Sequence, residues 1–157
     1  MGGISKYMPT PVHISYAGLE SALDWSSSAG PYENQAIICR RTGRVYLQSM
    51  HGDFEEEGLP EDIEDGSLYL AVPHKNELNL GRELVFEFVE AEAPKMESQV
   101  NAAFRQRGAY SKFKSILERS GLLERWYEYE AAATRCALNH WAQENGLVVP
   151  EAKRGGA

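Results

Sequence analysis

The 157-residue chain has no apolar run near the roughly 20 residues that a membrane-spanning helix needs. Its first residues, MGGISKYMPTPVH, also lack the apolar stretch of a signal peptide. We therefore expect a cytoplasmic protein with no membrane partner.

Cysteine is scarce, with only Cys39 and Cys136 in the chain. Each lies in a segment expected to be regular, and neither has a metal-type ligand close by in sequence. We expect both to be small buried hydrophobic residues, since a disulfide is unusual in a cytoplasmic protein.

The sequence motifs of metal-binding, phosphate-binding and catalytic sites are missing as well. The four histidines, at positions 13, 51, 74 and 140, do not have the spacing of a zinc site. No phosphate-binding glycine loop, dinucleotide fingerprint or nucleophile elbow occurs in the sequence. We therefore expect no catalytic residue, no metal site and no cofactor.

Charge is present but unevenly spread over a formal net charge of -7. Residues 53–65 hold eight acidic side chains and no basic one, and residues 105–125 hold six basic ones against two acidic. The acidic segment does not match a calcium loop, because Ile63 and Val72 stand where acidic ligands are needed. We interpret it as a solvated acidic loop.

Apolar spacing predicts one helix and three strands in the first half of the chain. Ser15 can cap a helix that ends near Trp25, with Ile14 and Leu19 forming a hydrophobic staple. Short β-prone runs at 36–39 and 45–47 flank Gly43, a residue that suits a tight hairpin turn. A third strand is expected at 67–72, before Pro73.

The second half of the chain predicts about four helices. Asn79 can cap a helix over 80–93, and Pro94 suits the first turn of the next. Ser111 can cap a third helix that ends at a left-handed Gly121, and the last helix is expected over 122–145. The apolar stripe of this last helix includes Trp126, Cys136 and Trp141.

Together these elements predict an α+β fold with an N-terminal helix, a small three-stranded antiparallel sheet and a C-terminal helical half. We expect one domain over 13–149, after a flexible lead-in at 1–12 and before a disordered tail at 150–157.

The basic stretch 105–125 is the best candidate site, because arginines and aromatics together can bind phosphates and stack on bases. Arg107, Tyr110, Lys112 and Lys114 are the candidate binding residues. The three cations surround the turn at Gly108, so we expect them to be exposed and close together. The alternative is that the basic residues are only the solvated side of a helix, with Phe113 and Trp126 in the core.

The stretch RGAYSKFKSILERSGLLERWYEYEAAATRCALNHWAQENG resembles the signature of the bacterial Uncharacterised Protein Family 0158. The matching features are Arg-Gly-Ala followed by an aromatic, a Phe-Lys pair, Gly-Leu, Trp-Tyr, and a closing Trp and Asn-Gly. The resemblance covers most of residues 14–147. It implies a compact α+β domain, and it implies no established activity or catalytic residues.

The leading functional hypothesis is a non-enzymatic binding or regulatory domain with a protein partner. The alternative is a nucleic-acid-associated regulatory module that uses stretch 105–125. A small-molecule enzyme is the third hypothesis.

Overall fold

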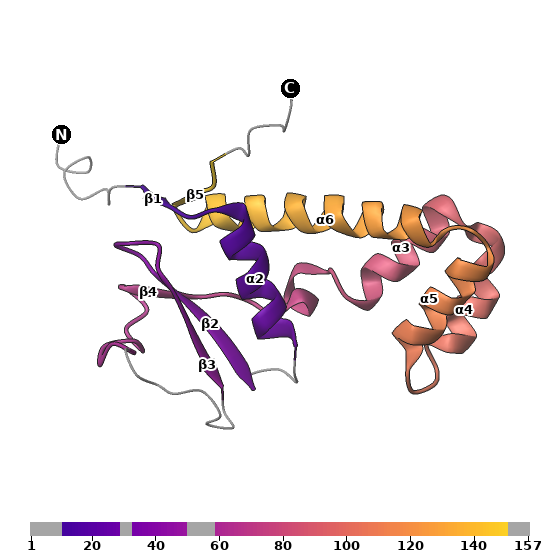
Figure 1. The fold of residues 1–157 in the computed structure, drawn as a ribbon, viewed down its shortest axis with the longest axis horizontal. Coiled ribbons are helices and arrows are strands. Elements are labelled where there is room, and N and C mark those ends of the chain that lie inside the picture. The colour runs from indigo at the N-terminus through magenta and orange to yellow at the C-terminus, as the bar shows by residue number, and fades with distance from the viewer. Residues whose placement is uncertain (1–10, 29–32, 50–58, 151–157) are drawn as a thin grey trace. The chain divides into compact units, whose positions relative to one another are not determined.

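A computed structural model describes residues 11–28, 33–49 and 59–150 (Figure 1). The chain groups into two compact units. The first, the sheet unit, comprises residues 1–75 and 138–157, and the second, the helical unit, comprises residues 76–137. The predicted α+β fold class is confirmed. The predicted single domain over 13–149 does not distinguish these two units.

The sheet unit contains a three-stranded antiparallel sheet in the order β3-β2-β4. Its strands are β2 (Asn34–Cys39), β3 (Val45–Ser49) and β4 (Tyr69–Ala71). The predicted hairpin is confirmed, and Gly43 turns it with a φ of 79°. A side chain at Gly43 would place its Cβ 2.6 Å from the carbonyl oxygen of His13. This turn therefore needs glycine for its conformation and for its closeness to the backbone.

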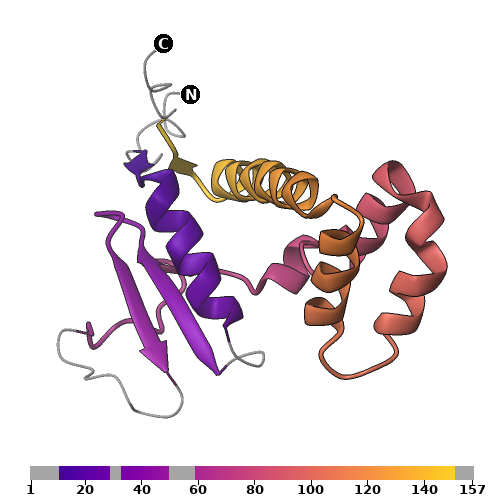
Figure 2. The ribbon, with the colours of Figure 1, turned by 45° about the vertical axis from the view of Figure 1, so that its right-hand side comes forward.

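Helix α2 (Tyr16–Ser27) packs on β2 and β3 (Figures 1 and 2). The predicted cap is confirmed, because the Ser15 hydroxyl accepts a hydrogen bond from the backbone N–H of Gly18 at 3.0 Å. The helix runs two residues past Trp25, and the buried Ser26 hydroxyl shares its one proton between the carbonyls of Leu23 and Pro73. These two bonds satisfy a hydroxyl that would otherwise favour a turn.

Strand β2 is buried on both faces, which explains its unbroken apolar run. Ile37 and Cys39 pack with Tyr69 on one face, together with residues of the 59–68 segment such as Ile63. Ala36 and Ile38 alternate with them and are fully buried on the face that α2 covers. Both layers of this small core thus depend on one central strand.

A second strand pair was not predicted from the sequence. Strand β1 (Val12–His13) pairs in parallel with β5 (Leu147–Val148), with Val12 opposite Leu147. Val12 is therefore part of a strand, which corrects its assignment to a flexible lead-in. Two-residue strands carry no alternation that could reveal them. Residues 1–10 and 151–157, the rest of the predicted lead-in and tail, lie outside the described residues.

The helical unit is built from short helices and the first part of a long one. In chain order these are η1 (Lys75–Leu78), α3 (Arg82–Glu92), η2 (Pro94–Met96), α4 (Glu97–Ala103), α5 (Ala109–Arg119) and α6 (Leu123–Glu144). The predicted position of Pro94 at a helix start is confirmed.

Two predicted helix caps are wrong. Asn79 has a φ of 58°, and α3 begins three residues later with Gly81 as its N-cap. Asn79 is instead a turn residue, since asparagine tolerates the left-handed region. Helix α5 begins at Ala109, after a left-handed Gly108, so Ser111 lies inside its first turn.

The left-handed Gly121 is confirmed, with a φ of 71°. The N–H of Leu122 donates to the carbonyl of Leu117 at 2.8 Å, and the N–H of Gly121 donates to that of Glu118 at 3.2 Å. This pair of bonds is the Schellman motif that ends a helix at glycine. Helices α5 and α6 are therefore separate.

Aromatic rings fill the core of the helical unit. The Phe113 and Trp126 rings meet edge to face with centroids 5.0 Å apart, and Phe88 meets Trp126 at 5.3 Å. Both residues predicted as core, Phe113 and Trp126, are fully buried. The indole N–H of Trp126 has no hydrogen-bond acceptor within the described part of the chain.

The predicted stripe of α6 fails in its second half. Cys136 is exposed, and the buried residues there are Leu138 and Ala142. Up to Ala137 the helix belongs to the helical unit, and from Leu138 it belongs to the sheet unit. One periodicity counted from Trp126 cannot describe a helix whose two ends belong to different cores. The expectation that Cys136 is buried is therefore wrong, whereas Cys39 is buried.

Candidate interaction surface

The four candidate residues from the sequence lie at the start of α5. Arg107 precedes the left-handed Gly108, and the other three lie within the first two turns of the helix. All four are exposed, and Tyr110 keeps 37% of its surface. The expected exposure of Arg107, Lys112 and Lys114 is confirmed.

The two lysines do not form one patch. The Lys112 Nζ donates to the side-chain oxygen of Gln106, ahead of α5. The Lys114 Nζ lies 5.8 Å from the ring centroid of Tyr127 on α6. Positions two apart on a helix differ by about 200° around its axis. The expectation that Arg107, Lys112 and Lys114 lie together is therefore wrong for Lys114.

Arg82 on α3 is a cation that the sequence analysis missed. Its guanidinium donates to the carbonyl oxygen of Phe104 at 3.0 Å. The same group lies 5.6 Å from the centroid of the Phe104 ring and 5.7 Å from that of Phe86. Because 22 residues separate Arg82 from Phe104, no local pattern in the sequence signals this contact.

Tyr110 joins this cation to Lys114. Its ring packs edge to face on Phe104, with centroids 5.2 Å apart, and Lys114 follows it by one helical turn. We call the rings and cations related by these contacts and by the four-residue spacing on α5 the aromatic–cation surface. Its members are Arg82, Phe86, Phe104, Tyr110, Lys114 and Tyr127.

The cations of this surface have no acidic partner. Among the described residues, no carboxylate lies within ion-pair distance of Arg82 or Lys114. Arg125, by contrast, pairs with Glu92 at 2.9 Å in the same unit. Within the described residues, both cations therefore contact aromatic rings and have no carboxylate counterion.

Burial and two charged groups, Arg82 and Glu130, affect the pKa of the Tyr110 hydroxyl. Burial raises the pKa of Tyr110, the nearby Arg82 lowers it and Glu130 raises it, with a net increase. The phenol thus stays protonated at neutral pH and can donate a hydrogen bond. Glu130 of α6 is the carboxylate that borders the surface here.

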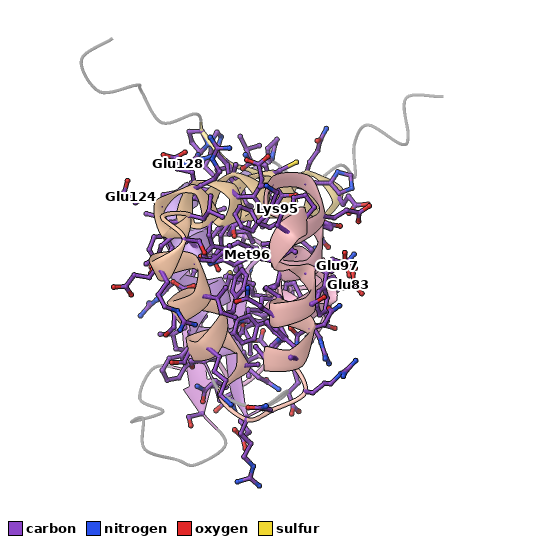
Figure 3. All side chains as sticks on the ribbon, turned by 90° about the vertical axis from the view of Figure 1, so that its right-hand side faces the viewer. Glu83, Lys95, Met96, Glu97, Glu124 and Glu128 are labelled. Carbon is purple, nitrogen blue, oxygen red and sulfur yellow. The ribbon has the colours of Figure 1, made fainter. Side chains whose placement is uncertain are left out.

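Other acidic side chains of the helical unit point outward. Figure 3 shows Glu124 and Glu128 of α6 on one side of this unit and Glu83 and Glu97, from α3 and α4, on the other. Basic and acidic side chains are therefore interspersed on the helical unit, and its basic residues do not form one large positively charged surface.

The turn after β2 holds a second polar cluster that the sequence analysis did not predict. Burial raises the pKa of the Cys39 thiol, but hydrogen bonds from Thr42 and Arg41 outweigh burial, so that the net pKa is lowered. Arg41 also interacts with Tyr69, whose hydroxyl donates to Asp62 at 2.9 Å. Cys39 is only 4% exposed, and its carbonyl accepts a hydrogen bond from the N–H of Gly43 at 2.9 Å in the same hairpin turn.

The described part of the acidic loop also has structural roles. The Asp65 carboxylate accepts from the backbone N–H and hydroxyl of Ser67, and these bonds lower the pKa of Asp65. Within residues 11–28, 33–49 and 59–150, no group of three or more His, Cys, Asp or Glu could hold a metal ion. His51 and residues 53–58 lie outside the described residues.

Two further results concern the chain as a whole. No described helix combines the length and the apolar character needed to cross a membrane. Comparison with protein-family models, curated proteins and solved structures finds no match. The resemblance to Uncharacterised Protein Family 0158 stays a prediction.

Proposed function

We propose that this chain is a non-enzymatic cytoplasmic binding or regulatory domain that takes a protein partner on its aromatic–cation surface. One observation carries the proposal: Arg82 and Lys114 lie over aromatic rings, and no carboxylate among the described residues pairs with either of them. The proposal includes membership of Uncharacterised Protein Family 0158, on the residues of stretch 107–146.

The composition of the surface supports a protein partner. Tyrosine and arginine are enriched where proteins bind one another, and they often dominate the binding energy. Tyr110 and Tyr127 are 37% and 45% exposed, and both belong to helices. Rigid elements lose little conformational entropy on binding. The carbonyl of Phe104 also holds the Arg82 guanidinium in place before any partner arrives.

Nucleic acid is the second candidate partner, because cations beside exposed tyrosines could also contact phosphates and stack on bases. The formal net charge of -7 and the outward acidic side chains of the helical unit weigh against it. The two candidates differ in their salt response, since each phosphate contact steepens the decrease in affinity with salt.

Affinity capture from native cytoplasm tests this proposal. The test variant carries Arg82→Glu and Lys114→Glu, and it should lose the proteins that the wild-type chain retains. The matched control carries Lys95→Glu and Arg119→Glu, which change the same charge at two exposed positions that are not members of the surface. Circular dichroism spectra and thermal melts establish that both variants fold.

Quantitative mass spectrometry of the retained proteins reads out the comparison. Loss in the test variant alone supports the proposal. Equal capture by the test variant and the wild type would reject the surface as the site. Equal loss in both variants would mean that only net charge matters.

A further inference from the structure

We infer that the occupant of the aromatic–cation surface is an acidic protein segment in which carboxylates alternate with apolar side chains. The inference rests on the proposed function and names the chemistry of its partner. Carboxylates would pair with Arg82 and Lys114, and an apolar side chain would cover the exposed rings of Tyr110 and Tyr127.

Charge complementarity requires an anionic occupant. An aromatic ring attracts a cation but does not neutralise its charge. Arg82 gives one hydrogen bond to the Phe104 carbonyl, and most of its N–H donors stay available. A planar guanidinium matches a carboxylate in two parallel hydrogen bonds. The Lys114 ammonium offers a second such position, one helical turn beyond Tyr110.

The spacing of the cations favours carboxylates that are separated by apolar residues. Tyr110 lies between the two cations, since it interacts electrostatically with Arg82 and precedes Lys114 by four residues on α5. Its exposed ring and that of Tyr127 would lose contact with water under an apolar side chain. A segment with both carboxylates and apolar side chains can therefore contact both cations and both exposed rings.

The acidic residues nearby disfavour a uniform polyanion. Glu130 influences the Tyr110 hydroxyl at the edge of the surface, and Glu128 and Glu124 belong to the same helix. A nucleic acid strand carries a charge on every phosphate and would meet these carboxylates. A peptide, by contrast, can place its few carboxylates only next to Arg82 and Lys114.

Fluorescence anisotropy with a defined probe tests the inference on the full chain. The probe is a short fluorescein-labelled synthetic peptide in which pairs of Glu alternate with Leu and Phe. Three comparison ligands accompany it: the same peptide with Gln for Glu, the same peptide with Ser for Leu and Phe, and a labelled oligothymidylate. The acidic–apolar peptide should bind saturably and more tightly than all three.

Matched variants then locate the site. Arg82→Gln with Lys114→Gln should weaken binding at least about tenfold, because both charge-assisted contacts are lost. Lys95→Gln with Arg119→Gln removes the same charge at two other exposed positions of the helical unit and should leave affinity unchanged. Lys114→Gln alone leaves the contact between Arg82 and Phe104 intact, and it gives the same comparison should the double variant unfold.

Three results would overturn the inference: equal binding of the Gln peptide, equal weakening by both variant pairs, or saturable binding of oligothymidylate with none of the peptide. If capture of cytoplasmic proteins still depends on Arg82 and Lys114 while the peptide does not bind, only the chemistry of the partner is wrong. If neither depends on them, the proposed function fails as well.

Discussion

The two units of this chain are stabilised in different ways. In the sheet unit, aliphatic side chains form the core, and the strands pair across long sequence distances, as Val12 does with Leu147. In the helical unit, aromatic rings form the core, and Phe88, Phe113 and Trp126 come from within 39 positions of one another. Local patterns can therefore reveal the helical core and the β2–β3 hairpin, whereas the β1–β5 pair depends on contacts that only the folded chain shows.

The largest expected change in stability distinguishes buried aromatic residues of the helical unit from an exposed one. Trp126→Ala and Phe113→Ala should each lower the free energy of unfolding by about 3–5 kcal/mol, because each removes a fully buried aromatic ring. Tyr127→Ala, next to Trp126 but 45% exposed, should change it by less than about 0.5 kcal/mol. Denaturant unfolding of the three variants makes the comparison, and a loss under about 1 kcal/mol for both core variants would contradict it.

The next prediction compares one left-handed glycine from each unit. Gly43→Ala should destabilise the protein by about 2–4 kcal/mol, because the residue has a positive φ and its new Cβ would meet the His13 carbonyl oxygen at 2.6 Å. Gly121→Ala meets nothing within 4 Å and should cost only the conformational strain, about 1–2 kcal/mol. Thermal melts of both variants measure the difference. Equal losses would show that the approach to His13 relaxes without cost.

These contrasts explain which parts of the fold could be predicted. Gly43 and Gly121 have the positive φ values expected from their places in a hairpin turn and between two apolar stripes. The hairpin followed from two β-prone runs that flank Gly43, and the buried positions of α5 followed from a period of about 3.6. The β1–β5 pair could not be predicted, because two residues are too few for a period.

The candidate site could be predicted only in part. Tyr110 and Lys114 followed from their positions beside aromatics in stretch 105–125, and both belong to the aromatic–cation surface. Arg82 did not follow, because it reaches Phe104 only through the packing of α3 in the helical unit. Exposure of a helical cation can be predicted from sequence, but the partner of its charged group is a tertiary property.

A third prediction concerns the start of α2 in the sheet unit. Ser15→Ala removes the acceptor of the Gly18 N–H and should cost about 1 kcal/mol. Ser111→Ala is the control in the helical unit, since Ser111 lies inside α5 and is not its cap, so we expect a change within about 0.5 kcal/mol. Urea unfolding of both variants tests this, and a larger loss for Ser111→Ala would reverse the assignment of the two caps.

The smallest expected effect depends on pH and compares the two cysteines. The folded-state pKa of Cys39 lies below its ordinary value of 9.0, so folding favours the thiolate. The stability that this thiolate contributes is complete above the unfolded-state pKa, and it is lost as the pH falls through the folded-state pKa. The gap in unfolding free energy between wild type and Cys39→Ser should therefore widen as the pH is raised towards 9.0.

Urea unfolding at several pH values, with a reducing agent present, measures this gap. Cys136→Ser is the control for removing a thiol, because Cys136 is exposed on α6. When Thr42→Val is present in both proteins, the difference in unfolding free energy caused by Cys39→Ser should increase less as the pH rises. Thr42→Val removes the side-chain hydrogen bond that contributes most to lowering the pKa of the thiol. A gap that stays constant or shrinks as the pH rises would mean that the hydrogen bonds of this turn do not outweigh the burial of Cys39.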